Sequence, residues 1–299
     1  MQFFNAAETA QLLHYPGLIS ALTRVLAEYG RGEIQSPERM VVPCGAGGLL
    51  LSMPCQARDV VVHKLLTIYA ANPGRHLPTI QGQVTCFDAE TGVPLFCLDG
   101  PTVTARRTAA ITMIGIDRLR PQPPRLISII GTGAQAAGHV KAMLERYPEA
   151  EIRIRGASHA DERSFCERFS AWKDRVAAHA AGPVGGDVVV AVTSSKVPVY
   201  DEAADPARLV IGVGAYRLDM IEIGARTIAG SQVYVDDPVG APVEAGDVVA
   251  AGTDWSGVVP LASSFDRQPD FSRPIFLKSV GCGAWDLAAC RAARTALTD

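Results

Sequence analysis

The sequence predicts an α/β protein in which a parallel sheet with helices on both faces is joined to a second, α+β domain. Two observations support this prediction. In the second half of the chain, continuous apolar runs alternate with helical patterns, as expected for a parallel sheet covered on both faces. In the first half, shorter apolar runs follow one another between glycines and prolines, which is typical of antiparallel strands.

The first half is expected to begin with a helix over residues 18–29, ended by Gly30. Strands are then expected within 39–44, 47–54 and 59–69, and a hairpin within 81–100. After the turn at Asp99-Gly100-Pro101, Thr102 or Thr104 is expected to cap a further helix. This mixture of helices and antiparallel strands predicts the α+β domain.

Three prolines within residues 121–124 mark a predicted domain boundary, because proline stops a helix and stiffens a linker. Strands are expected at 125–130, 151–155, 187–193 and 208–214, and helices at 131–144 and 160–172. Phe165, Phe169 and Trp172 would share the buried face of the second helix. The predicted domains are 1–120, joined by a returning tail 275–299, and 121–274.

The composition narrows the class of protein. A net charge of −3 argues against nucleic-acid binding. The seven cysteines contain no C-x-x-C pair and the six histidines no H-x-x-x-H pair, so we expect free thiols in a reducing compartment and no metal site. The N-terminus lacks a signal-peptide pattern, and no apolar run reaches the ~20 residues of a membrane span. We therefore expect a cytoplasmic protein without membrane contact.

Residues 131–136 form a G-x-G-x-x-A turn that directly follows an apolar strand and opens a helix. This context is what a Rossmann-type dinucleotide site requires. Gly131 permits the tight turn, Gly133 lets a pyrophosphate approach the backbone, and Ala136 keeps helix and strand close. The sequence therefore predicts an NAD(P)-binding Rossmann domain at 121–274, with the pyrophosphate on the N–H groups of the helix N-terminus.

The end of the next strand bears on the choice between the two nicotinamide cofactors. NAD sites usually place a carboxylate there to accept from the ribose 2′-hydroxyl. Here residues 155–159 read RGASH, with no carboxylate. Arg155, Ser158 or His159 can donate to a 2′-phosphate instead, so NADPH is favoured over NADH. The alternative is that Arg155 merely points to solvent.

Four polar residues of the first half stand out: Arg39, Lys64, Thr79 and Arg107. Lys64 lies within the apolar run VVVHKLLTIY, and a buried lysine is costly unless it meets an anion. A lysine on an edge strand with its head in water is the alternative. Arg39 and Arg107 taken singly are also compatible with ordinary surface positions.

Several motifs occur together along the chain. They are KLLTIYAANPGRHLPT (64–79), TGVPLFCLDG (91–100), TARRTAA (104–110), IIGTGAQA (129–136) and FLKSVGCGAWD (276–286). In this order they resemble the ornithine cyclodeaminase/mu-crystallin family over most of the chain. The resemblance implies that residues 1–120 and 275–299 form a substrate-binding and dimerisation domain, and that the protein is a homodimer.

The resemblance also implies roles for individual residues. Arg39, Lys64 and Arg107 would surround a substrate carboxylate, with Val280 beside the reacting centre and Lys64, Arg107 and Thr79 as the catalytic set. The implied cofactor contacts are Thr79, Arg107, Ala134, Gln135, Thr193, Ser194, Val213 and Ser279, beside Gly131 and Gly133. Thr193 and Ser194 are equally compatible with plain strand-end hydroxyls, and Val213 with core packing. Burial and neighbouring arginines would lower the pKa of Lys64 and suit it to proton transfer.

One departure from the family pattern is informative. Ornithine cyclodeaminases carry a catalytic aspartate after a Gly-Gly pair, whereas this chain reads Gly214-Ala215-Tyr216. A phenol is no carboxylate base near neutral pH, and Asp219 would need an altered loop to replace it. The resemblance therefore implies NAD(P)H-dependent reduction of a cyclic α-imino acid, Δ1-pyrroline-2-carboxylate or Δ1-piperideine-2-carboxylate, to L-proline or L-pipecolate. The alternatives are an ornithine cyclodeaminase, an alanine dehydrogenase, or a non-catalytic NADPH-dependent binding protein.

Overall fold

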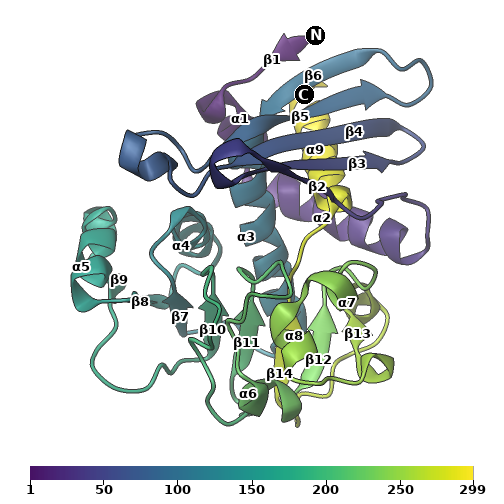
Figure 1. The fold of residues 1–299 in the computed structure, drawn as a ribbon. Coiled ribbons are helices and arrows are strands. Elements are labelled where there is room, and N and C mark those ends of the chain that lie inside the picture. The colour runs from purple at the N-terminus through teal and green to yellow at the C-terminus, as the bar shows by residue number, and fades with distance from the viewer. Residues whose placement is uncertain (299) are drawn as a thin grey trace. The chain divides into compact units, whose positions relative to one another are not determined.

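The computed structural model describes residues 1–298, which divide into two compact units (Figure 1). Unit 1 contains Met1–Ala110 and the chain from Gly281 onward, and unit 2 contains Ile111–Val280. The first boundary, after Ala110, lies ten residues before the predicted boundary at 120. The second boundary, after Val280, lies six residues after the predicted boundary at 274. Both differences have a structural cause: one helix continues through the first boundary, and the strand after residue 274 belongs to the sheet of unit 2.

Unit 1 is built on a six-stranded sheet with the order β1-β6-β5-β4-β3-β2. All neighbours pair antiparallel except β1 and β6, which are parallel. The strands are β1 (Gln2–Phe3), β2 (Met40–Cys44), β3 (Gly48–Gln56), β4 (Val60–Ile68), β5 (Ile80–Asp88) and β6 (Pro94–Asp99). The predicted strands and hairpin of the first half are thus confirmed.

One face of this sheet is covered by helices. They are α1 (Ala6–Leu12), α2 (Tyr15–Gly30) and α9 (Gly283–Thr298). Two short 3-10 turns, η1 (Gly45–Gly47) and η2 (Asn72–Arg75), lie in the connections between β2 and β3 and between β4 and β5. Helix α9 contacts β3, β4, β5 and α2. Its small side chains and Trp285 are buried, which lets it lie close to the sheet. The alternating pattern of β4 therefore directs Val60, Val62 and Lys64 into this layer.

Helix α3 (Gly100–Leu119) contains the first unit boundary. Its N-terminus is capped by Asp99, whose Oδ1 accepts from Thr102 N at 2.8 Å. The expected cap at Thr102 or Thr104 was wrong, because the helix begins before either residue. Thr104 instead donates to the Gly100 carbonyl within the first turn.

Unit 2 is built on an eight-stranded sheet with the order β13-β12-β14-β11-β10-β7-β8-β9, in which every pair is parallel. The strands are β7 (Leu126–Ile130), β8 (Glu151–Arg155), β9 (Val176–Ala178), β10 (Val188–Ala191), β11 (Leu209–Gly212), β12 (Gln232–Val235), β13 (Val259–Pro260) and β14 (Ile275–Lys278). The strand order reverses between β7 and β10. Doubly wound sheets bind ligands at such a switch point, outside the carboxyl ends of the strands.

Helices accompany the parallel strands of unit 2, as the α/β prediction required (Figure 1). They are α4 (Ala134–Arg146), α5 (His159–Glu167), α6 (Ala225–Ala229), α7 (Ala241–Glu244) and α8 (Gly246–Ala250), with 3-10 turns η3 (Ser170–Trp172), η4 (Trp255–Gly257) and η5 (Leu261–Phe265). The expected helix 160–172 is interrupted after Glu167. Phe165 and Phe169 are buried as expected, but Trp172 is 47% exposed, because η3 turns it away from that face.

In the described part of the chain, residues 1–298, no helix is both long and apolar enough to cross a membrane.

Candidate functional site

The glycine-rich turn of unit 2 fits a pyrophosphate. Gly131 has φ +127°, and a Cβ there would lie 3.0 Å from the Val192 carbonyl oxygen, so the tight turn after β7 requires glycine. Gly133 precedes α4 and has no atom within 4 Å of where its Cβ would stand. No side chain caps α4, so the first-turn N–H groups of Ala134 and Gln135 face open space. This is the donor set that a dinucleotide phosphate needs.

A second feature of this turn points to a bound ligand. Within residues 1–298, the buried Oε1 of Gln135 has no hydrogen-bond partner. Buried polar atoms are nearly always paired, so an orphan acceptor at the opening of α4 is expected to meet a donor on a ligand or a water molecule. Gln135 had been assigned to the cofactor on the resemblance alone.

The loops after β10 and β11 are held together by a carboxylate that sequence reasoning missed. Glu222 is buried and accepts from Thr193 N and Oγ1, from Gly214 N and from Ala215 N. Burial raises its pKa, and the charge of Lys278 partly opposes this. A Cβ on Gly214 would lie 1.9 Å from the Thr193 carbonyl oxygen, so only glycine allows the two loops to approach. The two hydrogen bonds to Glu222 therefore fix both the backbone and the hydroxyl of Thr193, unlike a strand-end hydroxyl that is free to rotate.

The other residues expected near the cofactor are distributed along the same strand ends. Ser194 is exposed, and Val213 is half-buried and donates its N–H to the Ala191 carbonyl. Ser279 directly follows β14, and its hydroxyl donates to Asp236 Oδ2 at 2.8 Å. Asp236 Oδ1 also accepts from Val280 N at 2.9 Å. Asp236, a second carboxylate missed from sequence, thus holds the hydroxyl of Ser279 and the backbone N–H of Val280.

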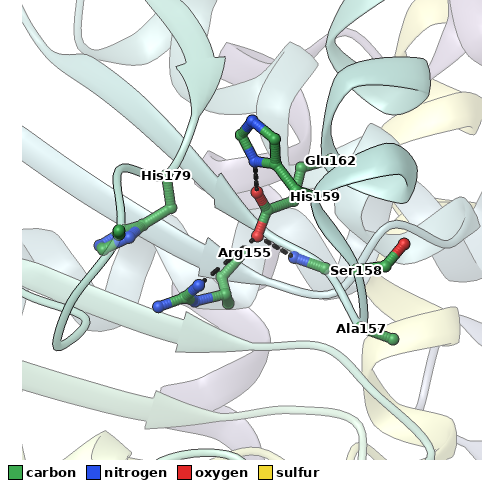
Figure 2. Close-up of a pocket in the computed structure, with 8 residues that line it drawn as sticks. Arg155, Ala157, Ser158, His159, Glu162 and His179 are labelled. Carbon is green, nitrogen blue, oxygen red and sulfur yellow. Dashed lines mark hydrogen bonds and ion pairs between the residues drawn. The ribbon is translucent and has the colours of Figure 1, made fainter.

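A cavity of about 330 Å³ opens at the end of β8 (Figure 2). Its lining residues include Arg155, Ser158, His159, Glu162 and His179. Arg155 does not simply point to solvent: its Nη2 donates to the Gly182 carbonyl, and its Nη1 lies 3.8 Å from Glu162 Oε1. In Rossmann folds generally, the end of the second strand is where the adenosine ribose binds.

The end of β8 carries no carboxylate, as the sequence shows, but the cavity contains one from another element, Glu162. Glu162 comes from helix α5, not from the end of β8, and its side chain turns back to Gly156 N and His159 Nδ1 (Figure 2). Burial opposes its ionisation, but those hydrogen bonds and the charge of Arg155 prevail, so the pKa of Glu162 is lowered. Its two oxygens already accept from groups of the protein.

Unit 1 gathers the predicted cations around another carboxylate. Lys64 on β4 is 2% exposed, which excludes the alternative of a lysine with its head in water. Its Nζ donates to Asp286 Oδ1 on α9 at 3.2 Å, and Arg107 Nε on α3 lies 3.5 Å from the same oxygen. Arg107 is 6% exposed and is likewise no surface arginine. We call Arg39, Lys64, Arg107 and Asp286 the cation cluster.

Gly281 ties the remaining arginine to this cluster. Arg39 Nη2 donates to the Gly281 carbonyl at 2.7 Å. Gly281 has φ +73°, and a Cβ there would lie 2.3 Å from Arg107 Nη1, so a side chain would push the guanidinium away. The structure thus brings Arg39, Lys64 and Arg107 together from separate stretches of the chain, as predicted.

The electrostatics of the cation cluster lower the proton affinity of Lys64. Burial is the largest cause, and the charges of Arg107 and Arg39 act in the same direction. Asp286 opposes them by its charge and its hydrogen bond. The result is a pKa of about 8 for Lys64, against 10.5 for a free lysine side chain. A group that titrates near neutral pH can both bind an anion and transfer a proton.

Thr79 is placed differently from the three cations. It precedes β5, is half-buried, and accepts from Tyr69 N through its backbone carbonyl. Its side chain makes no hydrogen bond to the rest of residues 1–298, so its expected contact to a cofactor stays a prediction. Asp286 was not singled out from sequence, although a carboxylate in the otherwise apolar stretch AWDLAA was a usable signal.

Comparison with known proteins gives consistent results. Residues 2–257 match the sequence pattern of the ornithine cyclodeaminase/mu-crystallin family. The chain is 51% identical to the Δ1-pyrroline-2-carboxylate/Δ1-piperideine-2-carboxylate reductase of Azospirillum brasilense over 98% of this chain and 95% of that protein.

Among solved structures, the fold is similar to the Δ1-pyrroline-2-carboxylate reductase of Thermococcus litoralis in complex with NADH and L-proline. The TM-score is 0.90 at 21% identity, covering 100% of this chain and 98% of that one. An archaeal alanine dehydrogenase dimer with bound NAD gives a TM-score of 0.88 at 19% identity, covering 100% and 96%.

Proposed function

The chain belongs to the ornithine cyclodeaminase/mu-crystallin family, and we propose that it is an NAD(P)H-dependent reductase that converts a cyclic α-imino acid, Δ1-pyrroline-2-carboxylate or Δ1-piperideine-2-carboxylate, to L-proline or L-pipecolate. The observation that carries the proposal is the cation cluster. Two buried cations, Lys64 and Arg107, share the single carboxylate of Asp286, and Arg39 adds a third positive charge. The cluster thus carries more positive than negative charge, and buried charge needs a partner of opposite sign. We propose that the substrate carboxylate is this partner.

The geometry of these donors suits a carboxylate. Arg107 Nε makes no hydrogen bond within residues 1–298, and Lys64 donates only one of its ammonium protons there. An arginine binds a carboxylate through two parallel hydrogen bonds, and a lysine adds a point charge. We therefore assign Arg39, Lys64 and Arg107 to the substrate carboxylate, which fixes the face that the α-carbon presents.

The residues of the cluster also provide for the proton that the reaction consumes. When bound, the reduced nicotinamide supplies a hydride to the imine carbon, while the nitrogen carries a proton, so that C=N becomes CH–NH. Lys64 is assigned to hold the proton at that nitrogen, since a pKa of about 8 leaves it cationic near neutral pH and able to release its proton. Most of the remaining rate enhancement comes from orientation of the substrate by the arginines.

The cofactor is assigned to the turn and strand ends of unit 2. Gly131, Gly133, Ala134 and Gln135 would hold the pyrophosphate, with Thr193, Ser194, Val213, Ser279 and Val280 towards the nicotinamide and Thr79 and Arg107 as further contacts. We infer that NADPH is preferred to NADH. Arg155, Ser158 and His159 line the cavity. Ser158 and His159 are paired with Asp161 and Glu162, but Arg155 makes one hydrogen bond among residues 1–298, to the Gly182 carbonyl, so its other guanidinium N–H groups are the donors for a 2′-phosphate.

The preference for NADPH is tested by Arg155→Ala, which should raise KM for NADPH about tenfold and change KM for NADH little. Arg153→Ala is the matched control, because Arg153 lies on the same strand but pairs with Glu151. Equal effects of the Arg155 variant on both cofactors would contradict the assignment.

Two observations disfavour cyclodeamination. The resemblance implies that Tyr216 stands at the position of the family's catalytic aspartate, and Asp219 is exposed and paired with Lys196 and Arg217. An exposed carboxylate in two ion pairs is a poor base for a buried substrate.

We also propose that the protein is a homodimer formed through unit 1. The edge strand β2 presents Met40, Val41 and Val42 at 61%, 48% and 39% exposure, an apolar stripe that a second copy would cover. The similar alanine dehydrogenase is a dimer. Light scattering on the purified protein measures the mass: a dimer supports the proposal, and a monomer at micromolar concentration contradicts it.

The function is tested by following NADPH and NADH oxidation with Δ1-pyrroline-2-carboxylate and Δ1-piperideine-2-carboxylate. L-ornithine and L-alanine with NAD⁺ or NADP⁺ test the alternatives in the opposite direction. We expect turnover of the cyclic imino acids and no ammonia from ornithine. An intact protein that binds NADPH but reduces neither imino acid would favour a binding protein.

A further inference from the structure

Asp286 occupies an unusual position for a carboxylate. It lies in the first turn of α9 and is fully buried. Oδ1 accepts from Lys64 and faces Arg107, while Oδ2 has no hydrogen-bond partner among residues 1–298. A buried carboxylate that uses only one of its oxygens is expensive to keep for stability alone. Because Asp286 contacts the Lys64 ammonium, we look for its role in the function of Lys64.

Asp286 supplies the negative charge next to Lys64, because the other groups packed there are neutral or cationic. The titratable groups that act on the Lys64–Asp286 pair are Cys290 on α9, Arg107 on α3, Arg39 before β2 and Cys55 on β3. The Cys86 thiol on β5, whose pKa is lowered by its hydrogen bond with Cys290, acts on Cys290 and not on Lys64. Burial raises the pKa of the Cys55 thiol to about 12, and burial also raises the pKa of Cys290. These two thiols stay neutral near pH 8, and both arginines are cationic. The charge that offsets the burial of the Lys64 ammonium is therefore that of Asp286.

We propose that Asp286 is a positioning residue for the reductase reaction: it keeps the Lys64 ammonium charged and oriented towards the substrate, so that one side chain both binds the carboxylate and serves proton transfer. The inference rests on the proposed function. Asp286 reaches the substrate through Lys64, and it presents Oδ1 to both buried cations so that neither can rotate away without losing its partner. Without this carboxylate, Lys64 would be neutral at the pH of the cytosol and would lose both tasks.

The test is Asp286→Asn, which keeps the shape and removes the charge. Loss of a close opposite charge lowers the pKa of a buried lysine by about 2 units, from about 8 to about 6. At pH 8 about half of the wild-type lysines and about 1% of the variant lysines would be charged, so kcat/KM should fall about 50-fold. At pH 6 the loss should shrink to about twofold. The ratio of the two enzymes at each pH cancels the titration of the substrate.

A matched control separates this role from a general loosening of α9. Asp59 anchors the same helix through Arg291 and Arg294 but does not contact Lys64. In the wild type, kcat/KM should fall as the pH rises through about 8, and we call this fall the alkaline limb of the pH profile. Asp59→Asn should leave the midpoint of the alkaline limb unchanged. Asp286→Glu keeps the charge and should have its midpoint near pH 8, as in the wild type. NADPH binding by each variant checks that unit 2 is folded. A loss in Asp286→Asn that is the same factor at every pH, or no loss at all, would overturn the proposal.

Two further measurements keep the test decisive. Lys64→Arg carries a charge that does not titrate, so the alkaline limb should vanish in its remaining activity; a limb that persists near pH 8 would overturn the proposal even if Asp286→Asn does not fold. If the wild type reduces no cyclic imino acid, the proposed function fails. The Asp286 inference is then read from the pH dependence of pyrrole-2-carboxylate binding, whose midpoint should fall by about 2 pH units in Asp286→Asn; an unchanged midpoint would overturn it.

Discussion

Binding of a carboxylate to the cation cluster should draw a proton onto Lys64. With a pKa of about 8, roughly one Lys64 in ten carries its proton at pH 9. A carboxylate at contact distance raises the pKa of a buried amine by about 2 units, which leaves roughly nine in ten protonated. We therefore expect uptake of about 0.8 proton per bound ligand at pH 9 and close to none at pH 6.5, where Lys64 is already charged.

Isothermal titration with pyrrole-2-carboxylate measures this uptake, because the binding enthalpy then depends on the ionisation enthalpy of the buffer. The ligand is planar, carries the ring carboxylate, and has no amine that titrates in this range. Lys64→Met should abolish the uptake, whereas Lys196→Met, which removes an exposed lysine paired with Asp219, should retain it. Binding without any buffer dependence at pH 9 would refute the assignment of Lys64 to the carboxylate.

Further predictions concern turnover, the cofactor and pH. Lys64→Met should lower kcat/KM by about 10³-fold with little change in the NADPH dissociation constant; activity within tenfold of wild type would exclude Lys64 from the chemistry. Arg107→Lys keeps the charge but loses the guanidinium fork, so KM for the imino acid should rise about tenfold in steady-state assays. Gly133→Ala meets no atom within 4 Å and should fold with an unchanged melting temperature, yet the dissociation constant for NADPH should rise at least about tenfold by fluorescence titration. Tyr216→Phe should keep kcat within about threefold, and a larger loss would assign the phenol a role in the reaction. Because the charged form of Lys64 is the active one, wild-type kcat/KM should fall as pH rises through about 8.

Features encoded by local pattern were predictable from the sequence. The alternation of apolar runs and helical stretches gave the parallel sheet of unit 2, and the strand–turn–helix context of Gly131 and Gly133 gave the dinucleotide turn. Lys64 was conspicuous because most of its neighbours on β4 are apolar. In each case the chemistry of a few adjacent residues decides the structure.

Features that depend on distant pairing were not predictable in the same way. Asp286 meets Lys64 across 222 positions of the chain, and nothing near either residue indicates the partner. Glu162 enters the cavity at the end of β8 from helix α5, so an inspection of the strand end alone missed it. The sequence prediction ends the second domain at residue 274, whereas unit 2 extends to Val280, because the pairing of β14 with β11 and β12 is set by the sheet and not by the segment itself.

A crystal structure with pyrrole-2-carboxylate bound tests the central claim most directly. The ligand carboxylate is predicted to lie within hydrogen-bond distance of the side-chain nitrogens of Arg39, Lys64 and Arg107, with Asp286 still holding Lys64. A carboxylate bound elsewhere, or one that leaves these three nitrogens directed at other groups, would contradict the account.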